Sequence, residues 1–300
     1  MSIPEEVFEK YRLAGKIAAD VRKETEKIVR EGMRILDLCE KIEALIRKKG
    51  GKPAFPCNVS INEVAAHYTS PPQDGRTIPN NSIVKVDIGV HVDGYITDTA
   101  VTVCFNSEHE NLVQTAEEAL EKAVEIIRPG LSVSQFGSAI EKVIKAHGLK
   151  PVSNLTGHQI GRYLIHTGKA LPNVSNFSMS KMSVGEVYAT EPFVTVADAA
   201  GKVEDAPEAY IFRFLKRKSL RDSYAKQLLS YIEDNFHTLP FTERWLQECV
   251  PQNRYRAAFS ELLTSKSVMF YPVFVEASGK PVAQAEHTVL VTKDGCVVLT

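Results

Sequence analysis

The sequence has few cysteines, and their arrangement fits neither a disulfide framework nor a thiolate zinc site. Only five occur in 300 residues, and they include no Cys-X-X-Cys pair. An odd number of scattered cysteines is typical of reduced thiols, so we expect a cytoplasmic protein without disulfides. The five are Cys39, Cys57, Cys104, Cys249 and Cys296.

Long apolar runs and an excess of charge are also missing. No stretch approaches the roughly 18 uncharged apolar residues that would cross a bilayer. The first residues, MSIPEEVFEKYR, carry acids where a signal peptide would have basic residues and an apolar core. Because the net charge is −1, nothing draws the whole chain to nucleic acid or to an anionic membrane. The sequence predicts a protein of one or two domains that binds neither membrane nor DNA.

What the sequence does contain is an internal repeat. Residues 30–53 align without gaps to residues 128–151, and both blocks end in a helical pattern, a glycine and Lys-Pro. Helical spacing of apolar residues extends over 4–30 and 33–49. Chance could explain the apolar matches between two amphipathic helices, but it explains the glycine and Lys-Pro agreement poorly. We predict two related helix–helix–strand halves with a site where they meet.

A hairpin pattern lies between residues 82 and 105. Apolar residues alternate on both sides of Asp93-Gly94, a pair suited to the positive φ angles of a tight turn. With that turn, Gly89 faces Asp98, and Asp87 lies diagonally across on the same face, about 7–8 Å away. One such aspartate can be a satisfied core or turn residue. Two on one face of an apolar hairpin equally fit a metal site, because unpaired buried carboxylates are costly.

Further candidates follow in the second half. Residues 187–198 read as a strand and 283–300 as a hairpin, with Glu191 and Glu286 in mid-strand positions. Either glutamate alone could lie at an edge, since an unpaired buried carboxylate costs several kcal/mol. His158 and His166 lie in TGHQIGRYLIHTGK. Single histidines are most often ordinary core or surface residues, but glycines beside these two would permit close backbone approach to a site.

The four strand carboxylates come in equal numbers from the two halves. With one imidazole they form an oxygen-rich set that suits two divalent ions, such as cobalt, manganese, iron or zinc, bridged by carboxylates. Paired metals of this kind serve hydrolysis, because they activate water and stabilise an oxyanion. The set consists of Asp87, Asp98, Glu191 and Glu286.

Several segments resemble the sequence blocks of one enzyme family. NEVAAHYTSP, VDIGVHVDGYITDTAVTV, LTGHQIGRYLIHTGK, ATEPF and AQAEHTVL are similar to blocks of the pita-bread metalloaminopeptidases. The resemblance extends over essentially the whole chain and is greatest to the type 2 methionine aminopeptidases, in a short archaeal-like form. It implies an α+β pita-bread fold, with two pseudo-symmetric halves around a curved antiparallel sheet and a dinuclear metal centre. It also implies removal of the initiator methionine from nascent proteins when the second residue is small.

The resemblance also implies a role for each motif residue. Asp87 would chelate one metal ion, Asp98 and Glu286 would bridge both ions, and His158 and Glu191 would complete the other site. Glu191 would also be the general base, His67 would lie near the substrate amide, and His166 would donate to the scissile carbonyl. The resemblance further suggests a wall for the methionine pocket, although each of its residues also fits a plain core position: Phe55, Ile165 and Tyr271.

Residues 204–270 differ in character from the rest. They contain helical patterns over 219–236, 242–249 and 254–265, with a small predicted core of Leu228, Tyr231, Trp245 and Phe259. We predict an inserted helical subdomain at 204–270, winged-helix-like as in the resembled family. The pita-bread catalytic domain would then comprise 1–203 and 271–300.

Partners follow from this interpretation. We expect the enzyme to act as a monomer on the N-termini of nascent polypeptides. Five basic residues of the insertion are either a solvated face or, as a hypothesis, a contact with ribosomal RNA: Arg213, Lys216, Arg217, Lys218 and Arg221.

Two alternatives stay open. Prolidases and proline-specific aminopeptidases share the five ligands, but they and type 1 methionine aminopeptidases usually space the two histidines seven apart and follow the second with Glu. Here the spacing is eight, and Thr167 follows His166. The other alternative is a metal-free relative that binds partners or nucleic acid. Such proteins lose ligands, whereas all five are present in this chain.

Overall fold

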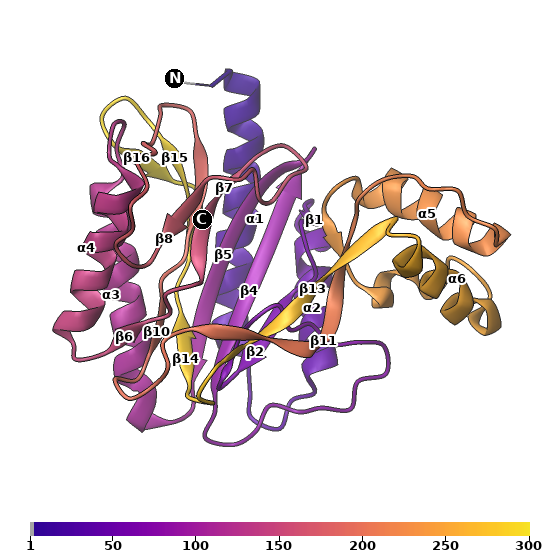
Figure 1. Ribbon diagram of the computed structural model, residues 1–300, viewed down its shortest axis with the longest axis horizontal. Coiled ribbons are helices and arrows are strands. Elements are labelled where there is room, and N and C mark those ends of the chain that lie inside the picture. The colour runs from indigo at the N-terminus through magenta and orange to yellow at the C-terminus, as the bar shows by residue number, and fades with distance from the viewer. Residues whose placement is uncertain (1–2) are drawn as a thin grey trace.

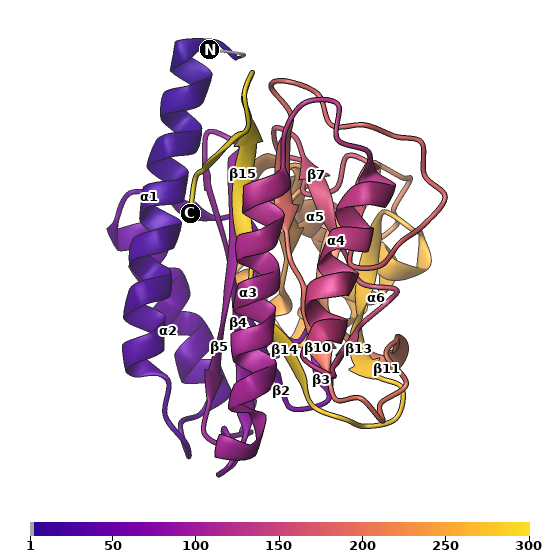
Figure 2. The ribbon, with the colours of Figure 1, turned by 90° about the vertical axis from the view of Figure 1, so that its left-hand side faces the viewer.

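The computed structural model describes residues 3–300, which form two similar halves and an insertion (Figures 1 and 2). The first half contains α1 (Glu5–Ile28), α2 (Ile35–Lys48), β1 (Lys52–Pro53), β2 (Asn58–Ile61), β3 (Val64–Ala66), β4 (Ile83–Val92) and β5 (Tyr95–Cys104). The second begins with the short helix η1 (Ser107–His109), α3 (Glu110–Ile126), α4 (Val133–Ala146), β6 (Lys150–Pro151), β7 (Thr156–Ile160), β8 (Ala170–Pro172), β9 (Val187–Thr190) and β10 (Phe193–Thr195). It ends with β14 (Val282–Gln284), β15 (His287–Val291) and β16 (Cys296–Val298).

The predicted repeat is confirmed. α1, α2 and β1 of the first half correspond in order to α3, α4 and β6 of the second. The matched glycines adopt the same left-handed conformation: φ is 75° at Gly32 and 81° at Gly130, and 91° at Gly50 and 71° at Gly148. The two Lys-Pro strands also pair alike, β1 with β4 and β6 with β10. The glycines agree because a side chain disfavours positive φ.

The predicted hairpin is confirmed with its register. Gly89 is paired with Asp98, and Asp87 with Ala100. The turn residues Asp93 and Gly94 have φ angles of 51° and 84°, as a two-residue turn of this hand requires. The alternation therefore places both aspartates on one face of a continuous ten-residue ladder.

Each half has its own core beneath its helices. The buried face of α1 packs on β4 and β5, and α3 packs on β10 and β14 (Figure 2). In the first half, Ile17 and Leu38 join Val86 and Ile88. In the second half, Leu112, Phe136 and Ile140 join Val289. The amphipathic helices thus close the outer side of the strands. No helix within residues 3–300 is long and apolar enough to cross a membrane.

The halves meet along a seam held mainly by side chains. Across this seam, within residues 3–300, β5 and the segment between β14 and β15 form one isolated backbone bridge, Ala100–Glu286. The Thr288 Oγ1 atom accepts from the Asp98 amide at 2.7 Å and donates to the Asp98 carbonyl at 2.8 Å. The Thr99 hydroxyl donates to the Glu286 carbonyl at 2.8 Å. These threonines fix the backbones of Asp98 and Glu286 relative to each other.

Two segments predicted as continuous strands are interrupted. Residues 187–198 form β9 and β10, separated at Glu191-Pro192, because β9 pairs with β7 and β15 while β10 pairs with β6 and β14. Pro192 has no amide hydrogen for a ladder. Similarly, the chain changes sheets between β14 and β15, at Ala285-Glu286. The prediction that both glutamates lie mid-strand was therefore wrong. Each lies where the chain leaves one sheet for another. The predicted hairpin at the end of the chain is formed by β15 and β16.

The insertion contains more strand than the sequence predicted. It comprises β11 (Val203–Phe214), α5 (Ser223–Phe236), β12 (Pro240–Phe241), the short helix η2 (Glu243–Leu246), α6 (Gln252–Thr264) and β13 (Val268–Glu276). α5 and α6 occupy one end of the molecule (Figure 1). β13 crosses the predicted boundary at residue 270 and pairs with β3 of the first half. The segment 242–249, predicted as a helix, forms only the short η2 turn.

The small core of the insertion is largely as predicted. Leu228 and Phe259 are buried in it, and Trp245 packs against it. Tyr231 was predicted there but is 38% exposed. It lies on α5 between the inward-facing Leu228 and Ile232, and its ring contacts Phe236 edge-on instead.

Candidate metal centre

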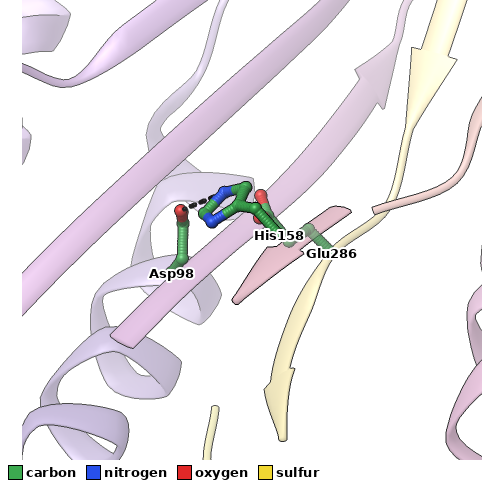
Figure 3. Close-up of side chains that lie close together, drawn as sticks. All are labelled: Asp98, His158 and Glu286. Atoms are coloured by element: carbon green, nitrogen blue, oxygen red, sulfur yellow. Dashed lines mark ion pairs between the residues drawn. The ribbon is translucent and has the colours of Figure 1, made fainter. Parts of the chain in front are cut away.

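The predicted ligands converge from both halves on one buried point. Figure 3 shows the side chains of Asp98 on β5, His158 on β7 and Glu286 before β15 directed toward one another. Each offers one donor atom, and the three atoms lie within 4.8 Å of one another. His158 Nε2 is 3.6 Å from Asp98 Oδ2 and 3.5 Å from Glu191 Oε1. Four of the five predicted ligands thus form one cluster around His158.

Two amide side chains that the sequence analysis did not single out hold the carboxylates in place. Gln284 Nε2 donates to Glu191 Oε2 at 3.2 Å and to Glu286 Oε2 at 3.3 Å. Asn58 Nδ2 donates to Asp87 Oδ2 at 3.2 Å, because β2 pairs Asn58 directly with Asp87. Strand alternation gave a usable signal for Gln284, which lies two residues before Glu286. No such signal was available for Asn58, because the pairing of β2 with β4 is not encoded locally.

Burial strongly disfavours charge on the four carboxylates. It raises the pKa of Asp87 from 3.8 to about 7. Burial, followed by the neighbouring carboxylates, raises the pKa values of Asp98, Glu191 and Glu286 well above their ordinary range. Burial also lowers the pKa of His158 well below 6.5. The cluster therefore cannot hold four negative charges unless positive charge is placed among them.

The donor set fits divalent metal ions. One oxygen of each of three carboxylates is buried without a hydrogen-bond partner: Asp87 Oδ1, Asp98 Oδ1 and Glu286 Oε1. Buried acceptors without partners are rare in proteins and call for an explanation. Carboxylate oxygens with a neutral imidazole are the ligands preferred by manganese, iron, cobalt and zinc. Cations between these residues would satisfy the free oxygens and remove the electrostatic penalty.

A cavity of about 340 Å³ opens onto the cluster. Asp87, Asp98, His158 and Glu191 lie in its wall, whereas Glu286 is buried behind it. The predicted His67 and His166 also line it, as do the three residues suggested for a methionine pocket: Phe55, Ile165 and Tyr271. The cavity has further apolar lining that sequence analysis missed: Ile211, Pro240, Phe193 and Phe274.

The two cavity histidines that are not predicted ligands, His67 and His166, are neutral near pH 7. Burial lowers the pKa of both His67 and His166 to about 4. His67 has a φ of 64°, an uncommon conformation for a residue with a side chain. Its Nδ1 lies 3.2 Å from the Pro272 carbonyl, so Nε2 is the ring nitrogen that remains to contact a substrate. The ring centroids of His158 and His166 are 4.3 Å apart, so His166 lies beside the carboxylate cluster.

Two glycines make the close packing of the site possible. A Cβ atom at Gly89 would lie 2.2 Å from the Phe55 ring, and one at Gly157 would lie 2.4 Å from the Ala189 carbonyl. Gly89 therefore lets Phe55 pack over β4 into the cavity wall. Gly157 lets β7 lie close to β9, which places His158 near Glu191.

Comparisons with known proteins agree with this geometry. The profile of metallopeptidase family M24 matches residues 9–293. The methionine aminopeptidase of Methanothermobacter thermautotrophicus is 45% identical over 98% of this chain and 99% of its own length. That of Thermococcus kodakarensis is 42% identical over 96% and 97%.

Solved structures share the fold at low sequence identity. A thermophilic Arx1 superposes with a TM-score of 0.82 and 20% identity, over 99% of this chain and 91% of its own. The methionine aminopeptidase of Thermotoga maritima superposes with a TM-score of 0.72 and 21% identity, over 100% and 98%. The sequence matches and the ligand cluster lead to one conclusion: this chain belongs to metallopeptidase family M24, with the pita-bread fold of that family.

Proposed function

We propose that this protein is a methionine aminopeptidase that releases the N-terminal methionine of nascent proteins whose second residue is small. The observation that carries the proposal is the convergence of the five predicted ligands, from both halves, beside an apolar cavity that His67 and His166 also line. The near full-length similarity to archaeal methionine aminopeptidases supports the same activity. The resemblance of the sequence blocks to those of the type 2 enzymes supports the same proposal.

We further propose that Asp87, Asp98, His158, Glu191 and Glu286 hold two divalent ions. When bound, such ions would act as Lewis acids toward water and the scissile carbonyl. Five ligands, of which four are carboxylates, suffice for a pair of ions bridged by carboxylates. Asp98 and Glu286 suit the bridging role, because the threonine seam fixes their backbones relative to each other.

In this proposal Glu191 is the general base. Its Oε1 lies toward His158, and its Oε2 accepts a hydrogen bond from Gln284. As a carboxylate beside the ions that the site would hold, Glu191 would accept a proton from the attacking water. The same group can then return that proton to the leaving amine.

His166 and His67 would act on the substrate peptide. Because the pKa of His166 is about 4, its neutral ring can donate a hydrogen bond to the scissile carbonyl oxygen as negative charge develops there. His67 would contact the amide through Nε2. Phe55, Ile165 and Tyr271 would enclose the methionine side chain, together with Ile211 and Pro240.

We propose domain boundaries that follow the sequence pattern, with residues 204–270 inserted into a catalytic domain of 1–203 and 271–300. The insertion would narrow the approach to the ligands, since Ile211 of β11 and Pro240 of β12 lie in the cavity wall.

Peptide hydrolysis tests the proposed activity. Release of methionine from Met-Ala-Ser should exceed release of the first residue from Xaa-Pro peptides in which Xaa is not methionine. Equal or faster cleavage of the Xaa-Pro series would favour a proline-specific enzyme. If no peptide is cleaved with any divalent metal, the protein is a non-catalytic relative.

A ribosome contact remains a separate hypothesis within this proposal. Of the five basic residues, Arg213 is half-buried and the other four are exposed: Lys216, Arg217, Lys218 and Arg221. Arg217 also pairs with Glu233 at 2.5 Å. Phosphate contact would make ribosome binding strongly salt-dependent. Co-sedimentation with ribosomes at low and moderate salt should weaken when these four residues become Ser or Gln. Binding that is unchanged in that variant would contradict the RNA contact.

A further inference from the structure

Two arginines of the insertion lie in contrasting surroundings. Arg244, whose side chain is 5% exposed, forms an ion pair with Glu43 at 2.7 Å. It also donates to the Ser70 carbonyl at 2.7 Å and to Thr69 Oγ1 at 3.1 Å. All of these acceptors belong to the first half, so Arg244 docks the insertion onto it. Its hydrogen bonds are accounted for by the fold alone.

Arg213 is half-buried but has no comparable partners. Its Nη2 lies 3.2 Å from the thioether sulfur of Met269, a weak acceptor. Its Nε is buried without any hydrogen-bond partner. No carboxylate among residues 3–300 lies within ion-pair distance of it. Burying the Nε–H of a guanidinium without an oxygen acceptor is unfavourable.

The position of Arg213 follows from strand register. Ile211, opposite Tyr271, lines the cavity. Arg213 comes two residues later on the same face, opposite Met269 on one side and Pro240 on the other. Beyond it the strand reaches solvent at the exposed Leu215. Arg213 therefore lies beside the cavity-lining residues Ile211 and Pro240, on the side nearer to Leu215.

The charge of Arg213 is felt inside the cavity. It acts to lower the pKa of Tyr271, which lines the cavity, against the larger effect of burial. The other titratable groups at this place, His67, His166 and Tyr271, are neutral near pH 7. The guanidinium is thus an uncompensated positive charge at the rim of a peptide-binding cavity.

We propose that Arg213 forms a subsite that binds a carboxylate of the substrate beyond the scissile bond. This inference rests on the proposed function and adds to it a substrate preference. A planar guanidinium with free N–H groups matches a carboxylate in two-pronged geometry. The carboxylate can come from an acidic side chain after the small second residue, or from the free C-terminus of a short peptide. For a nascent protein only the acidic side chain is available.

Peptides that differ only in charge test this subsite. The first series is amidated and has Asp or Asn at the third or the fourth position, as in Met-Ala-Asp-Gly-Gly amide and Met-Ala-Asn-Gly-Gly amide. A second pair, Met-Ala-Gly-Gly with a free or an amidated C-terminus, isolates the terminal carboxylate. The Asp/Asn ratio of kcat/KM should be roughly 3 to 10 at one of the two positions, as for a partly exposed charge pair.

Three variants assign the preference to the guanidinium. Arg213→Met removes the charge with little loss of volume, and the Asp/Asn ratio should fall to about 1. Arg213→Lys keeps the charge without the planar fork and should retain part of the ratio. Arg256→Met removes the same charge from an exposed site on α6 and should leave the ratio as in the wild type. Thermal unfolding of each variant checks that it is folded.

The outcomes separate this proposal from the proposed activity. A wild-type ratio of 1 in both peptide series, or a ratio that Arg213→Met leaves intact, would overturn the subsite. If no methionine is released from any peptide, the activity itself fails. Calorimetry with the same peptides then gives the Asp/Asn ratio in Kd, which Arg213→Met must still abolish. If only the free C-terminus shows an effect, the subsite serves short peptides and not nascent proteins.

Discussion

The two halves of the molecule repeat the same elements but present their carboxylates in different ways. In the first half, Asp87 and Asp98 stand on one regular hairpin with an unbroken ladder. In the second half, Glu191 and Glu286 stand where strands break and the chain changes sheets. Strand alternation is enough to place a pair of short side chains on one face. Glu191 and Glu286 must reach toward the first half. They can do so because a break in the strand frees the backbone there from ladder hydrogen bonds.

The difference also explains how the halves are joined. A continuous backbone hydrogen-bond ladder between β5 and β15 would hold these strands at the usual distance between neighbouring strands of a sheet. Instead, Thr99 and Thr288 hold Asp98 and Glu286 by side-chain hydrogen bonds. The centre therefore depends on a regular first half, an interrupted second half and a seam between them. The following predictions test these parts in order of decreasing effect.

The largest effect is expected at the interrupted half. Glu191→Gln removes the proposed base and should lower kcat by about 10²–10⁴. The protein should stay folded and keep at least one metal ion, measured by metal analysis beside methionine release. Glu204→Gln, at an exposed carboxylate of β11, is the control and should behave as wild type. Wild-type turnover in Glu191→Gln would remove Glu191 from the mechanism.

His166→Ala comes next. Losing a donor to a developing oxyanion typically costs about 10²–10³ in kcat, and metal content should not change. His147→Ala, at an exposed histidine that pairs with Glu118, controls for the loss of an imidazole. Should His166→Ala lose its metal, His166 would be a ligand and the assignment of roles would have to change.

The seam is tested by removing one hydroxyl. Thr288→Val leaves the Asp98 amide and carbonyl without their side-chain partner, which should lower the free energy of unfolding by about 1–3 kcal/mol. Metal affinity measured by calorimetry should also fall, because Asp98 is no longer held toward Glu286. Thr288→Ser should restore both quantities.

A Thr→Val substitution at a second buried site distinguishes the loss of the seam hydrogen bonds from the general effect of replacing Thr by Val on stability. Thr115 of α3 is fully buried, and its hydroxyl has no hydrogen-bond partner. Thr115→Val should therefore be neutral or stabilising. If Thr288→Val and Thr115→Val have equal effects, the seam does not position the ligands.

The smallest effect concerns pH. Between about pH 4 and 7, the folded metal-free protein keeps a proton on Asp87 that the unfolded chain has lost, because folding raises that pKa from 3.8 to about 7. This contribution to stability is present at low pH and is lost as pH rises through 7. Bound cations must displace the proton, so they stabilise the fold more at high pH.

The measurement is the rise in the midpoint of thermal unfolding on adding manganese. It should be larger at pH 7.5 than at pH 6.0, by roughly 2–4 °C for each kcal/mol of differential binding. Comparing metal-loaded with metal-free protein at each pH cancels the pH-dependent stability contributed by groups outside the centre, such as the buried Lys85. A rise that does not depend on pH would mean that metal binding displaces no protons from these carboxylates.

Local patterns in the sequence were enough for much of this structure. Asp93-Gly94 fixed the register of the hairpin, and the glycine and Lys-Pro agreement revealed the two halves. Where tertiary contacts override local pattern, prediction failed. The strands break at Glu191 and Glu286 because the segments before and after each glutamate belong to different sheets. No local sequence pattern indicates this change of sheet. β11 was missed because its apolar and charged residues do not alternate cleanly, and because its partner β13 is more than 50 residues away.

The site divides in the same way. The resemblance to the metalloaminopeptidases supplied the five ligands, His67 and His166. The structure brings all of them to one cavity except Glu286, which is buried beside the other ligands. Strand alternation gave a signal for Gln284, but Asn58 and Arg213 are recognisable only once strand pairing is known. Their importance lies in which groups they face, and their residue types alone carry no such information.

The central claim is that carboxylates from both halves together form one metal centre. Diffraction from crystals grown with manganese, recorded at the manganese absorption edge, tests it most directly. The account predicts two anomalous peaks, both among Asp87, Asp98, His158, Glu191 and Glu286, with Asp98 and Glu286 touching both. A single peak would contradict the dinuclear centre. Peaks only at other places on the protein would contradict the metal centre itself.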